Sequence, residues 1–167
     1  MALGRTSFWQ NEWGTAAVEM ALMLPILMAL LFAGMEGSYY FWSEHRVVKA
    51  VRDGARYAGR QSFDQFSCST TSTVAATATN IKNLTRTGTL DGTGAPLIPG
   101  WADTQTAITV AACNSATATG LFLTQANGAV RVTVSADVPY QSLFSSLGIS
   151  TATLRLRASQ QAVVMGL

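Results

Sequence analysis

A single carboxylate lies inside the most apolar stretch of the chain. Residues 13–27 read WGTAAVEMALMLPIL, so Glu19 is surrounded by side chains suited to lipid and follows Gly14 by five positions. An acid at the centre of a membrane helix costs roughly 2.5–3.5 kcal/mol on insertion scales, and less near the interface. We therefore expect Glu19 either to pair with a cationic group when helices pack together or to lie close enough to the interface to reach water.

The chain contains two cysteines, Cys68 and Cys113, which are 45 positions apart and belong to no C-x-x-C pair. This spacing is not that of a zinc site or of thioredoxin-like redox chemistry, so we expect no metal site. We expect a disulfide between the two cysteines, which would stabilise the domain by about 4 kcal/mol in the chain-entropy model. Two independent buried thiols are the alternative, because a free cysteine behaves as a small hydrophobic residue.

Catalytic chemistry has little support in the sequence. His45 is the only histidine, and it lies on a basic segment without a neighbouring nucleophile motif. The sequence contains no Walker loop, no H-E-x-x-H and no G-x-S-x-G. We therefore expect a protein that is not an enzyme, has no catalytic residues, and needs neither a cofactor nor a small-molecule substrate.

The composition separates a lipid-like segment from a polar remainder. Of the 167 residues, 49% are hydrophobic and only 12% are charged, and Met20–Met35 holds no charged residue. These 16 residues become long enough to cross roughly 30 Å of hydrocarbon if Thr15–Val18 or Gly37–Trp42 extend them. The aromatic run Tyr39–Trp42 is typical of a membrane interface. The alternative is a buried helix of a soluble protein, but a chain this short has little core in which to bury it.

The helical pattern continues past the aromatic residues. One apolar stripe at helical spacing comprises Val48, Val51, Ala55 and Ala58. A helix from Thr15 to about Gly59 would have 45 residues and a length of ~67 Å, twice a bilayer, so its second half would be the spine of a domain. Gly54 weakens this helix, and Gly59 is expected to end it. Pro25 is expected to bend or locally open it, because proline cannot donate to the carbonyl of Ala21.

Residues 61–167 predict a small mixed domain. Ser72–Leu84 is expected to be a helix whose buried stripe comprises Val74, Ala78, Ile81 and Leu84. Gly88–Gly100, with the sequence GTLDGTGAPLIPG, is a loop by its glycines and prolines. Three strands are expected at about Gln105–Ala112, Ala129–Val138 and Ala152–Gln160, the middle one with strict alternation of valine or alanine against polar residues. The predicted fold is α+β, with a long N-terminal transmembrane helix, a second helix and a three- to four-stranded, mostly antiparallel sheet.

Two motifs at a fixed spacing indicate a family. The segment GTAAVEMALMLPIL followed by GARYAGR resembles the TadE-like minor pilins, or pseudopilins, of the tight-adherence (Tad, or Flp) pilus system, a type IV-like pilus. The resemblance includes the A-V-E-x-A core Ala17–Ala21, Pro25, the run Asp53–Ala58 and the C-terminal sequence VRVTVSADVPYQSLFSSLG. It implies a structural protein that takes part in pilus assembly and hence in surface adhesion.

The resemblance also implies proteolytic processing. A prepilin-type aspartic peptidase would remove residues 1–14 as a leader by cutting between Gly14 and Thr15, which makes Glu19 the fifth mature residue. Glycine suits such a cut because a backbone without Cβ can approach an enzyme closely. The new amine would lie only ~6 Å along the helix from Glu19, so Glu19 would act in assembly by pairing with an amine of its own or of a neighbouring subunit. The remaining domains would be 15–60, transmembrane and spine, and 61–167, extracytoplasmic.

The charge distribution and the proposed topology conflict. Five Lys/Arg residues lie between Arg46 and Arg60 but only Arg5 precedes the apolar segment, so the positive-inside rule alone would place the C-terminal domain in the cytoplasm. Leader cleavage on the cytoplasmic side and two spaced cysteines favour the opposite orientation. We expect a single-pass protein of the bacterial inner membrane, with its C-terminal domain outside the cytoplasm and a place in a surface pilus.

The expected partners are the peptidase, other pilins with the pilus assembly machinery, and membrane lipid. Arg131, Arg155 and Arg157 add a basic patch, but a net charge of +2 and a membrane anchor argue against nucleic acid. A second functional class stays open, namely a membrane-anchored or secreted binding domain that does not polymerise. In that case residues 1–33 would be an anchor or an ordinary signal peptide, although Leu31 makes ALLFAG a poor cleavage site.

Overall fold

The computed structural model describes residues 12–67, 72–114, 120–123, 128–145, 148 and 153–166. The chain divides into two compact units, Met1–Tyr39 and Tyr40–Leu167. One helix, α1, runs from Glu12 to Gly59 and so contributes to both units. The predicted long N-terminal helix is therefore confirmed, and the helix continues on both sides of Pro25. A bend at Pro25 stays a prediction.

In the first unit, α1 has no buried face. Every residue from Gly14 to Met35 is exposed, so the apolar side chains point outward in all directions around the helix. A helix that stabilises a water-soluble domain normally buries one apolar stripe and exposes a polar face. This segment lacks that asymmetry, and its hydrophobic residues therefore need a non-aqueous environment.

In the second unit, the C-terminal part of α1 has a one-sided core. Its buried residues are Ser43, Val47, Ala50, Val51, Gly54, Ala55, Ala58 and Gly59. The predicted residues Val51, Ala55 and Ala58 are among them, whereas Val48 is half-buried. Most of these side chains are small, so neighbouring elements can approach the α1 backbone closely.

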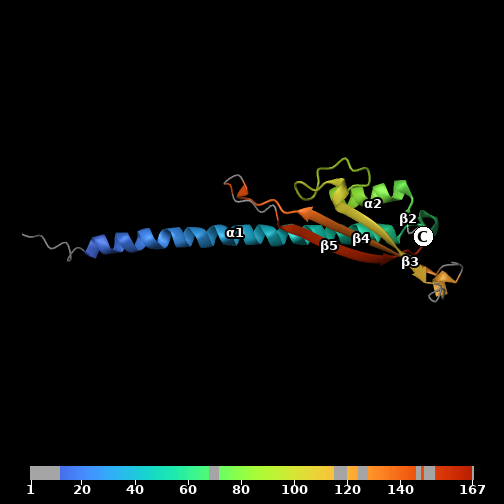
Figure 1. Ribbon diagram of the computed structural model, residues 1–167, viewed down its shortest axis with the longest axis horizontal. Coiled ribbons are helices and arrows are strands. Elements are labelled where there is room, and N and C mark those ends of the chain that lie inside the picture. The colour runs from blue at the N-terminus through green and yellow to red at the C-terminus, as the bar shows by residue number, and fades with distance from the viewer. Residues whose placement is uncertain are drawn as a thin grey trace, which may run out of the picture. The chain divides into compact units, whose positions relative to one another are not determined.

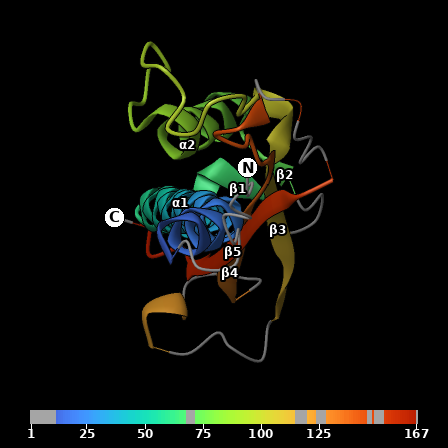
Figure 2. The same cartoon turned by 90° about the vertical axis from the view of Figure 1, so that its left-hand side faces the viewer.

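A three-stranded antiparallel sheet packs against the helices. Its strands are β3 (Thr106–Asn114), β4 (Ala129–Pro139) and β5 (Arg155–Val163), in the order β3-β4-β5. On β4, the side chains of Val130, Val132, Val134, Ala136 and Val138 are buried, as the alternation predicted. Figure 2, viewed along α1, shows α1 and α2 (Ala75–Thr87) on one side of this sheet. The observed fold is the expected two-layer α+β arrangement (Figure 1).

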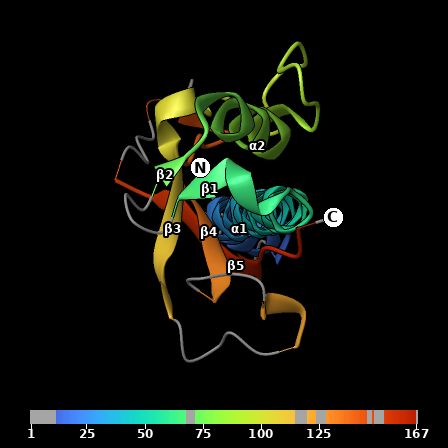
Figure 3. The same ribbon diagram turned by 90° about the vertical axis from the view of Figure 1, so that its right-hand side faces the viewer.

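The predicted second helix begins three residues late, because its first residues form a strand. Ser72 and Thr73 are β2 (Ser72–Thr73) and pair with β1 (Phe66–Ser67) in an antiparallel ladder. The backbone N–H of Val74 then donates to the carbonyl of Gln65 at 2.8 Å. Figure 3 shows β2 beside β3. The hydrogen bonds of this short ladder replace the first helical turn that the sequence pattern suggested.

The buried face of α2 differs from the predicted stripe. Val74 precedes the helix and is 45% exposed, and the buried residues are Thr77, Ile81, Thr85 and Thr87. Only Ile81 was predicted correctly. Threonine can occupy this face because its hydroxyl is satisfied locally: Thr85 Oγ1 donates to the carbonyl of Ile81 at 2.7 Å. The buried face is therefore displaced around the helix from the predicted stripe, with Ala78 and Leu84 half-buried at its edge.

The third predicted strand lies three residues later than expected. β5 begins at Arg155 rather than Ala152, and Leu154 is 47% exposed. Leu156 is fully buried, which confirms the alternation over that part of the strand. The register is set by pairing with β4, in which Val138 faces Leu156 and Ala136 faces Ala158.

α1 and α2 are in close contact at Gly54. A Cβ atom added there would lie 2.1 Å from Thr85 Oγ1 and 3.6 Å from Cγ1 of Val134. α1, α2 and β4 therefore meet at a position where only glycine fits without displacement. The glycine that weakens helix propensity in the sequence is required by the tertiary packing.

We expect Gly54→Ala to destabilise the domain by about 1–2 kcal/mol, because overpacking costs roughly 1–3 kcal/mol and outweighs the gain in helix propensity. Equilibrium unfolding of the detergent-solubilised chain measures the change. Gly37→Ala is the matched control, since nothing lies within 4 Å of the Cβ that it would add. Thr85→Ala removes the clashing hydroxyl and should reduce the cost of Gly54→Ala. If Gly54→Ala is as stable as the wild type, the close contact is wrong.

Candidate functional site

The residues at the predicted processing site are accessible along α1. Gly14 and Thr15 are exposed, and nothing lies within 4 Å of the Cβ that could be added to Gly14. Glu19 is also exposed, one helical turn after Thr15. No ion pair joins Glu19 to another side chain that the structure describes. The three residues lie on one short helical segment, as their spacing predicted.

The exposed apolar span is longer than the uncharged run in the sequence. Gly14–Met35 comprises 22 exposed residues, which corresponds to ~33 Å of helix and matches ~30 Å of hydrocarbon. Within the described chain, one helix is long and apolar enough to cross a membrane, with a mean hydropathy of 2.2 over its most apolar window. Glu19 lies about 7 Å along the helix from Gly14, near one end of the span rather than at its centre.

The aromatic run after this span is divided between two environments. Tyr40 packs edge-on against Tyr140, with ring centroids 5.1 Å apart and an interplanar angle of 74°. Phe41 is 62% exposed, and the guanidinium of Arg46 lies 4.8 Å from the ring centre of Trp42. Tyr40 is thus half-buried against the buried ring of Tyr140, whereas Phe41 and Trp42 keep exposed surface. Their position at a membrane interface stays a prediction.

Three basic residues of α1 form an exposed stripe. Lys49, Arg52 and Arg56 are exposed at intervals of three or four residues, and Arg60, directly after the helix, is exposed as well. Arg56 makes an exposed ion pair with Asp53 at 3.7 Å. His45 is exposed on the same helix. Among the described residues, no group of three His, Cys, Asp or Glu side chains could hold a metal ion.

The predicted disulfide falls outside what the structure describes. Cys68 lies outside the described residues, and Cys113 belongs to β3 but its side chain is not described. The Cys68–Cys113 bond stays a prediction.

Two of the three arginines of the predicted basic patch converge on one carboxylate. Arg155 binds Asp137 through Nε, and its Nη2 also donates to the carbonyl of Asp137 at 2.9 Å. Arg157 faces Asp137 across the β4–β5 ladder, with its Nε 3.4 Å from Oδ2. The hydrogen bond from Arg155 lowers the pKa of Asp137 from its usual 3.8, and the charges of both arginines lower it further. Sequence reasoning had placed these arginines on one face but did not identify Asp137.

These side chains border a groove on the outer face of the sheet, with a volume of about 740 Å³. Its lining residues come from two places: the short 3₁₀ helix η3 (Asp103–Gln105) and all three strands β3, β4 and β5. No pattern in the sequence indicated this groove, because its residues are separated by up to 55 positions along the chain.

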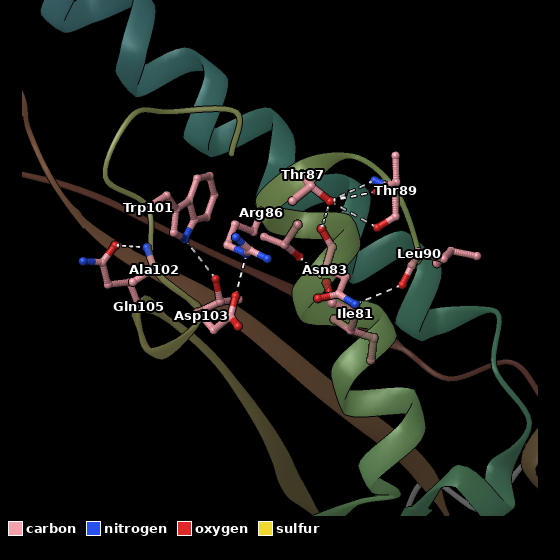
Figure 4. A network of polar contacts seen from close by, with 12 residues as sticks. Ile81, Asn83, Arg86, Thr87, Thr89, Leu90, Trp101, Ala102, Asp103 and Gln105 are labelled. Atoms are coloured by element: carbon pink, nitrogen blue, oxygen red, sulfur yellow. Dashed lines mark hydrogen bonds and ion pairs between the residues drawn. The ribbon is translucent and has the colours of Figure 1, made fainter. Parts of the chain in front are cut away.

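A polar network attaches η3 to α2 (Figure 4). The indole N–H of Trp101, a fully buried residue, donates to Thr106 Oγ1 at 3.1 Å. Arg86 Nε lies 2.6 Å from Asp103 Oδ1 in an ion pair, although its N–H is not aligned for a hydrogen bond. The backbone N–H of Ala102 donates to Gln105 Oε1 at 2.9 Å. These contacts hold one wall of the groove in place.

The lowered pKa of Asp137 gives a pH prediction with a definite sign. A carboxyl whose pKa is lower in the folded state stabilises the fold above pH 3.8, and this contribution is lost as the pH falls through the lowered value. We expect Asp137→Asn to be slightly less stable than the wild type at pH 7, by less than about 1 kcal/mol because the pair is partly exposed. Unfolding measured from pH 7 to pH 2.5 should show the two proteins converging at the acid end. A difference that grows on acidification would contradict the assignment.

Comparison with known proteins identifies the N-terminal segment. The model of the TadE-like protein family matches residues 14–56, about a quarter of the chain. No curated protein and no solved structure matches the chain significantly. The match begins at Gly14 and includes Glu19, Pro25 and the run from Asp53 to Arg56. Residues 14–56 are therefore TadE-like, which confirms the resemblance and is consistent with a pilin-related protein of Tad systems.

Proposed function

We propose that the protein is a minor pilin or pseudopilin that takes part in assembly of a Tad pilus, and that it has no enzymatic activity. One observation carries the proposal. The family match begins at Gly14, and the segment Gly14–Met35 that it includes is apolar and exposed on every face, with Glu19 about one helical turn after Thr15. A helix that is apolar on every face can be covered by lipid before assembly and by other helices after it.

Cleavage after Gly14 would place a new cation beside Glu19. The amine of Thr15 and the carboxylate of Glu19 would be separated by one helical turn, and the positive end of the helix dipole also favours an acid there. Between two subunits, the same charges favour the axial stagger that brings them together. Removal of one member of a desolvated pair leaves the other unpaired, which is strongly unfavourable. Glu19 would thus favour one axial stagger between neighbouring helices over the others.

The position of Glu19 permits insertion before assembly. Its carboxylate lies near the end of the 22-residue span, where an acid costs less than the roughly 2.5–3.5 kcal/mol of the helix centre. A subunit can therefore remain in the membrane with Glu19 close to the interface, and the carboxylate becomes desolvated only when helices pack around it. The charge pair would therefore stabilise the assembled helices without being needed to hold the single subunit in the membrane.

We further propose that the second unit lies outside the cytoplasm and that the leader faces the cytoplasm, where a membrane peptidase cuts it. The positive-inside rule counts basic residues within roughly 15–20 positions of the membrane end, so Arg46, Lys49 and Arg52 oppose this orientation. Residues farther into a large folded domain contribute little, because such domains cross membranes largely regardless of their charge. The proposed orientation therefore rests on leader cleavage at the cytoplasmic side rather than on the distribution of charge.

Gly14→Leu should leave the full-length protein in the membrane, because the bulky side chain blocks the close approach that cleavage after glycine allows. N-terminal sequencing and intact mass of protein from a host with the prepilin peptidase measure the outcome. Gly34→Leu is the matched control, since it is also an exposed helical glycine with nothing within 4 Å. A wild-type N-terminus at Thr15 is expected. An N-terminus at Gly34 would instead indicate a signal peptide, and one at Met1 or Ala2 a permanent anchor that does not polymerise.

Glu19→Gln should be inserted and cleaved normally but should be incorporated into the pilus at least tenfold less efficiently, because the neutral amide cannot compensate the amine. Co-purification with the other pilins and a count of assembled pili measure incorporation. Glu44→Gln, the same change in a half-buried residue of the second unit, is the control. If Glu19→Gln supports normal piliation while Gly14→Leu does not, processing stands and the charge-pairing mechanism must be abandoned.

A further inference from the structure

The outer face of the sheet carries a groove that the pilin proposal does not use. It lies opposite the face that packs on the helices, and its volume is about 740 Å³. The lining residues are Thr104, Gln105, Ala107, Ser135, Ala136, Asp137, Arg155, Arg157, Ala158 and Ser159. Most of them are polar or charged, in contrast to the valine-rich inner face.

The strand register explains why the groove exists. Ala107 of β3 faces Ser135 of β4, and Ser135 faces Ser159 of β5, so three small side chains form a row across the sheet. The next outward row towards η3 contains the longer pair Asp137 and Arg157. On the other side, the following row contains Thr133 and Gln161. A row of small residues between rows of larger ones leaves a depression that runs across the strands.

At one wall of the groove, the two guanidinium groups have more N–H donors than Asp137 has oxygen atoms to accept them. Each guanidinium has five N–H donors, whereas Asp137 supplies one carboxylate to both Arg155 and Arg157. Arg157 contacts Asp137 only at 3.4 Å, and its side chain is 72% exposed. The wall therefore offers N–H donors and one net positive charge towards the groove.

The groove is also lined by hydrogen-bond acceptors. The hydroxyls of Ser135 and Ser159 and the carboxylate of Asp137 can accept hydrogen bonds from a ligand. A suitable ligand therefore carries an anionic group for the arginines together with N–H or O–H donors for the acceptors. A peptide with acidic side chains supplies both, because its backbone carries N–H donors beside the carboxylates, whereas a phosphodiester linkage carries negative charge and no N–H or O–H donor.

The groove is pre-formed at its η3 end. Thr104 and Gln105 line it, and the Trp101–Thr106 and Arg86–Asp103 contacts attach this segment to the core and to α2 (Figure 4). A wall that is already ordered loses little conformational entropy when a ligand binds. The arginines on β5 are likewise held by the Asp137 contacts.

We propose that this groove binds an acidic peptide segment of a partner protein, with a carboxylate at Arg157 and backbone N–H groups at Asp137 and the serines. Charge complementarity favours this occupant, because residues 40–167 contain ten Lys/Arg against six Asp/Glu. None of the ten lining residues is aromatic, so the stacking surface on which sugar rings usually pack is missing from the lining. The inference does not depend on the pilin proposal, since a membrane-anchored binding domain would use the same groove.

The test uses the full chain in nanodiscs of zwitterionic phosphatidylcholine and a fluorescein-labelled hexaglutamate peptide. Fluorescence anisotropy should show saturable binding of hexaglutamate and at least tenfold weaker binding of hexaglutamine. Arg157→Gln should weaken hexaglutamate binding about tenfold or more, because a charge-assisted contact is lost. Arg131→Gln is the matched control: it removes the same charge from an exposed position on the same face, outside the groove, and should change affinity less than twofold.

A second pair of variants tests shape rather than charge. Ser159→Leu fills the row of small residues and should abolish binding, whereas Gln161→Leu, two residues along the same strand, should not. Circular dichroism and thermal unfolding check that each variant is folded. Equal losses for Arg157→Gln and Arg131→Gln would mean diffuse electrostatic attraction and would overturn the site. Tighter binding of an oligogalacturonate or an oligothymidylate than of hexaglutamate would overturn the peptide assignment.

Discussion

The close contact of α1 with α2 and β4 at Gly54 is the constraint on which the compact unit depends. A Cβ at this position would lie 2.1 Å from Thr85 Oγ1, so the two helices can meet only because one of them has no side chain there. The contact also explains the composition of both faces. α1 presents mainly small residues, and α2 presents Thr85 and Thr87, whose hydroxyls donate to carbonyls of their own helix. At this contact the helices pack through small side chains, while larger apolar side chains such as Trp101, Ile98 and Leu156 fill other parts of the core.

The surface of α1 changes in character along its length. From Gly14 to Met35 every side chain is exposed, and no face is reserved for a core. After Tyr40 one face is buried under the sheet and α2, while basic residues occupy the exposed side. Lipid or other helices can therefore cover the segment Gly14–Met35, whereas the sheet and α2 of the same chain cover one face of α1 after Tyr40. Glu19 lies in the first of these segments, where no ion pair joins it to another residue that the structure describes.

The sheet separates the two faces of the domain in a comparable way. Its inner face contributes the valines of β4 to the core, so its composition is determined by packing. Its outer face is free of that requirement, and there Asp137 orders two arginines beside a row of small residues. Since partly exposed ion pairs contribute little to stability, packing does not dictate the composition of this face. The apolar span belongs to the first compact unit and the groove to the second. Their proposed roles can therefore be tested separately.

Features that depend on local periodicity and spacing could be predicted from the amino-acid sequence alone. The long helix, the alternation of β4 and the Gly14–Glu19 segment all follow from patterns within a few neighbouring residues, because helix and strand geometry repeats over that range. Tertiary structure decided which side of α2 is buried, why Gly54 is required, and that Asp137 meets Arg155 and Arg157. Those features depend on which elements lie next to one another: Thr85 packs against α1 where Gly54 leaves room for it, and residues on separate strands form a groove only when the register aligns them.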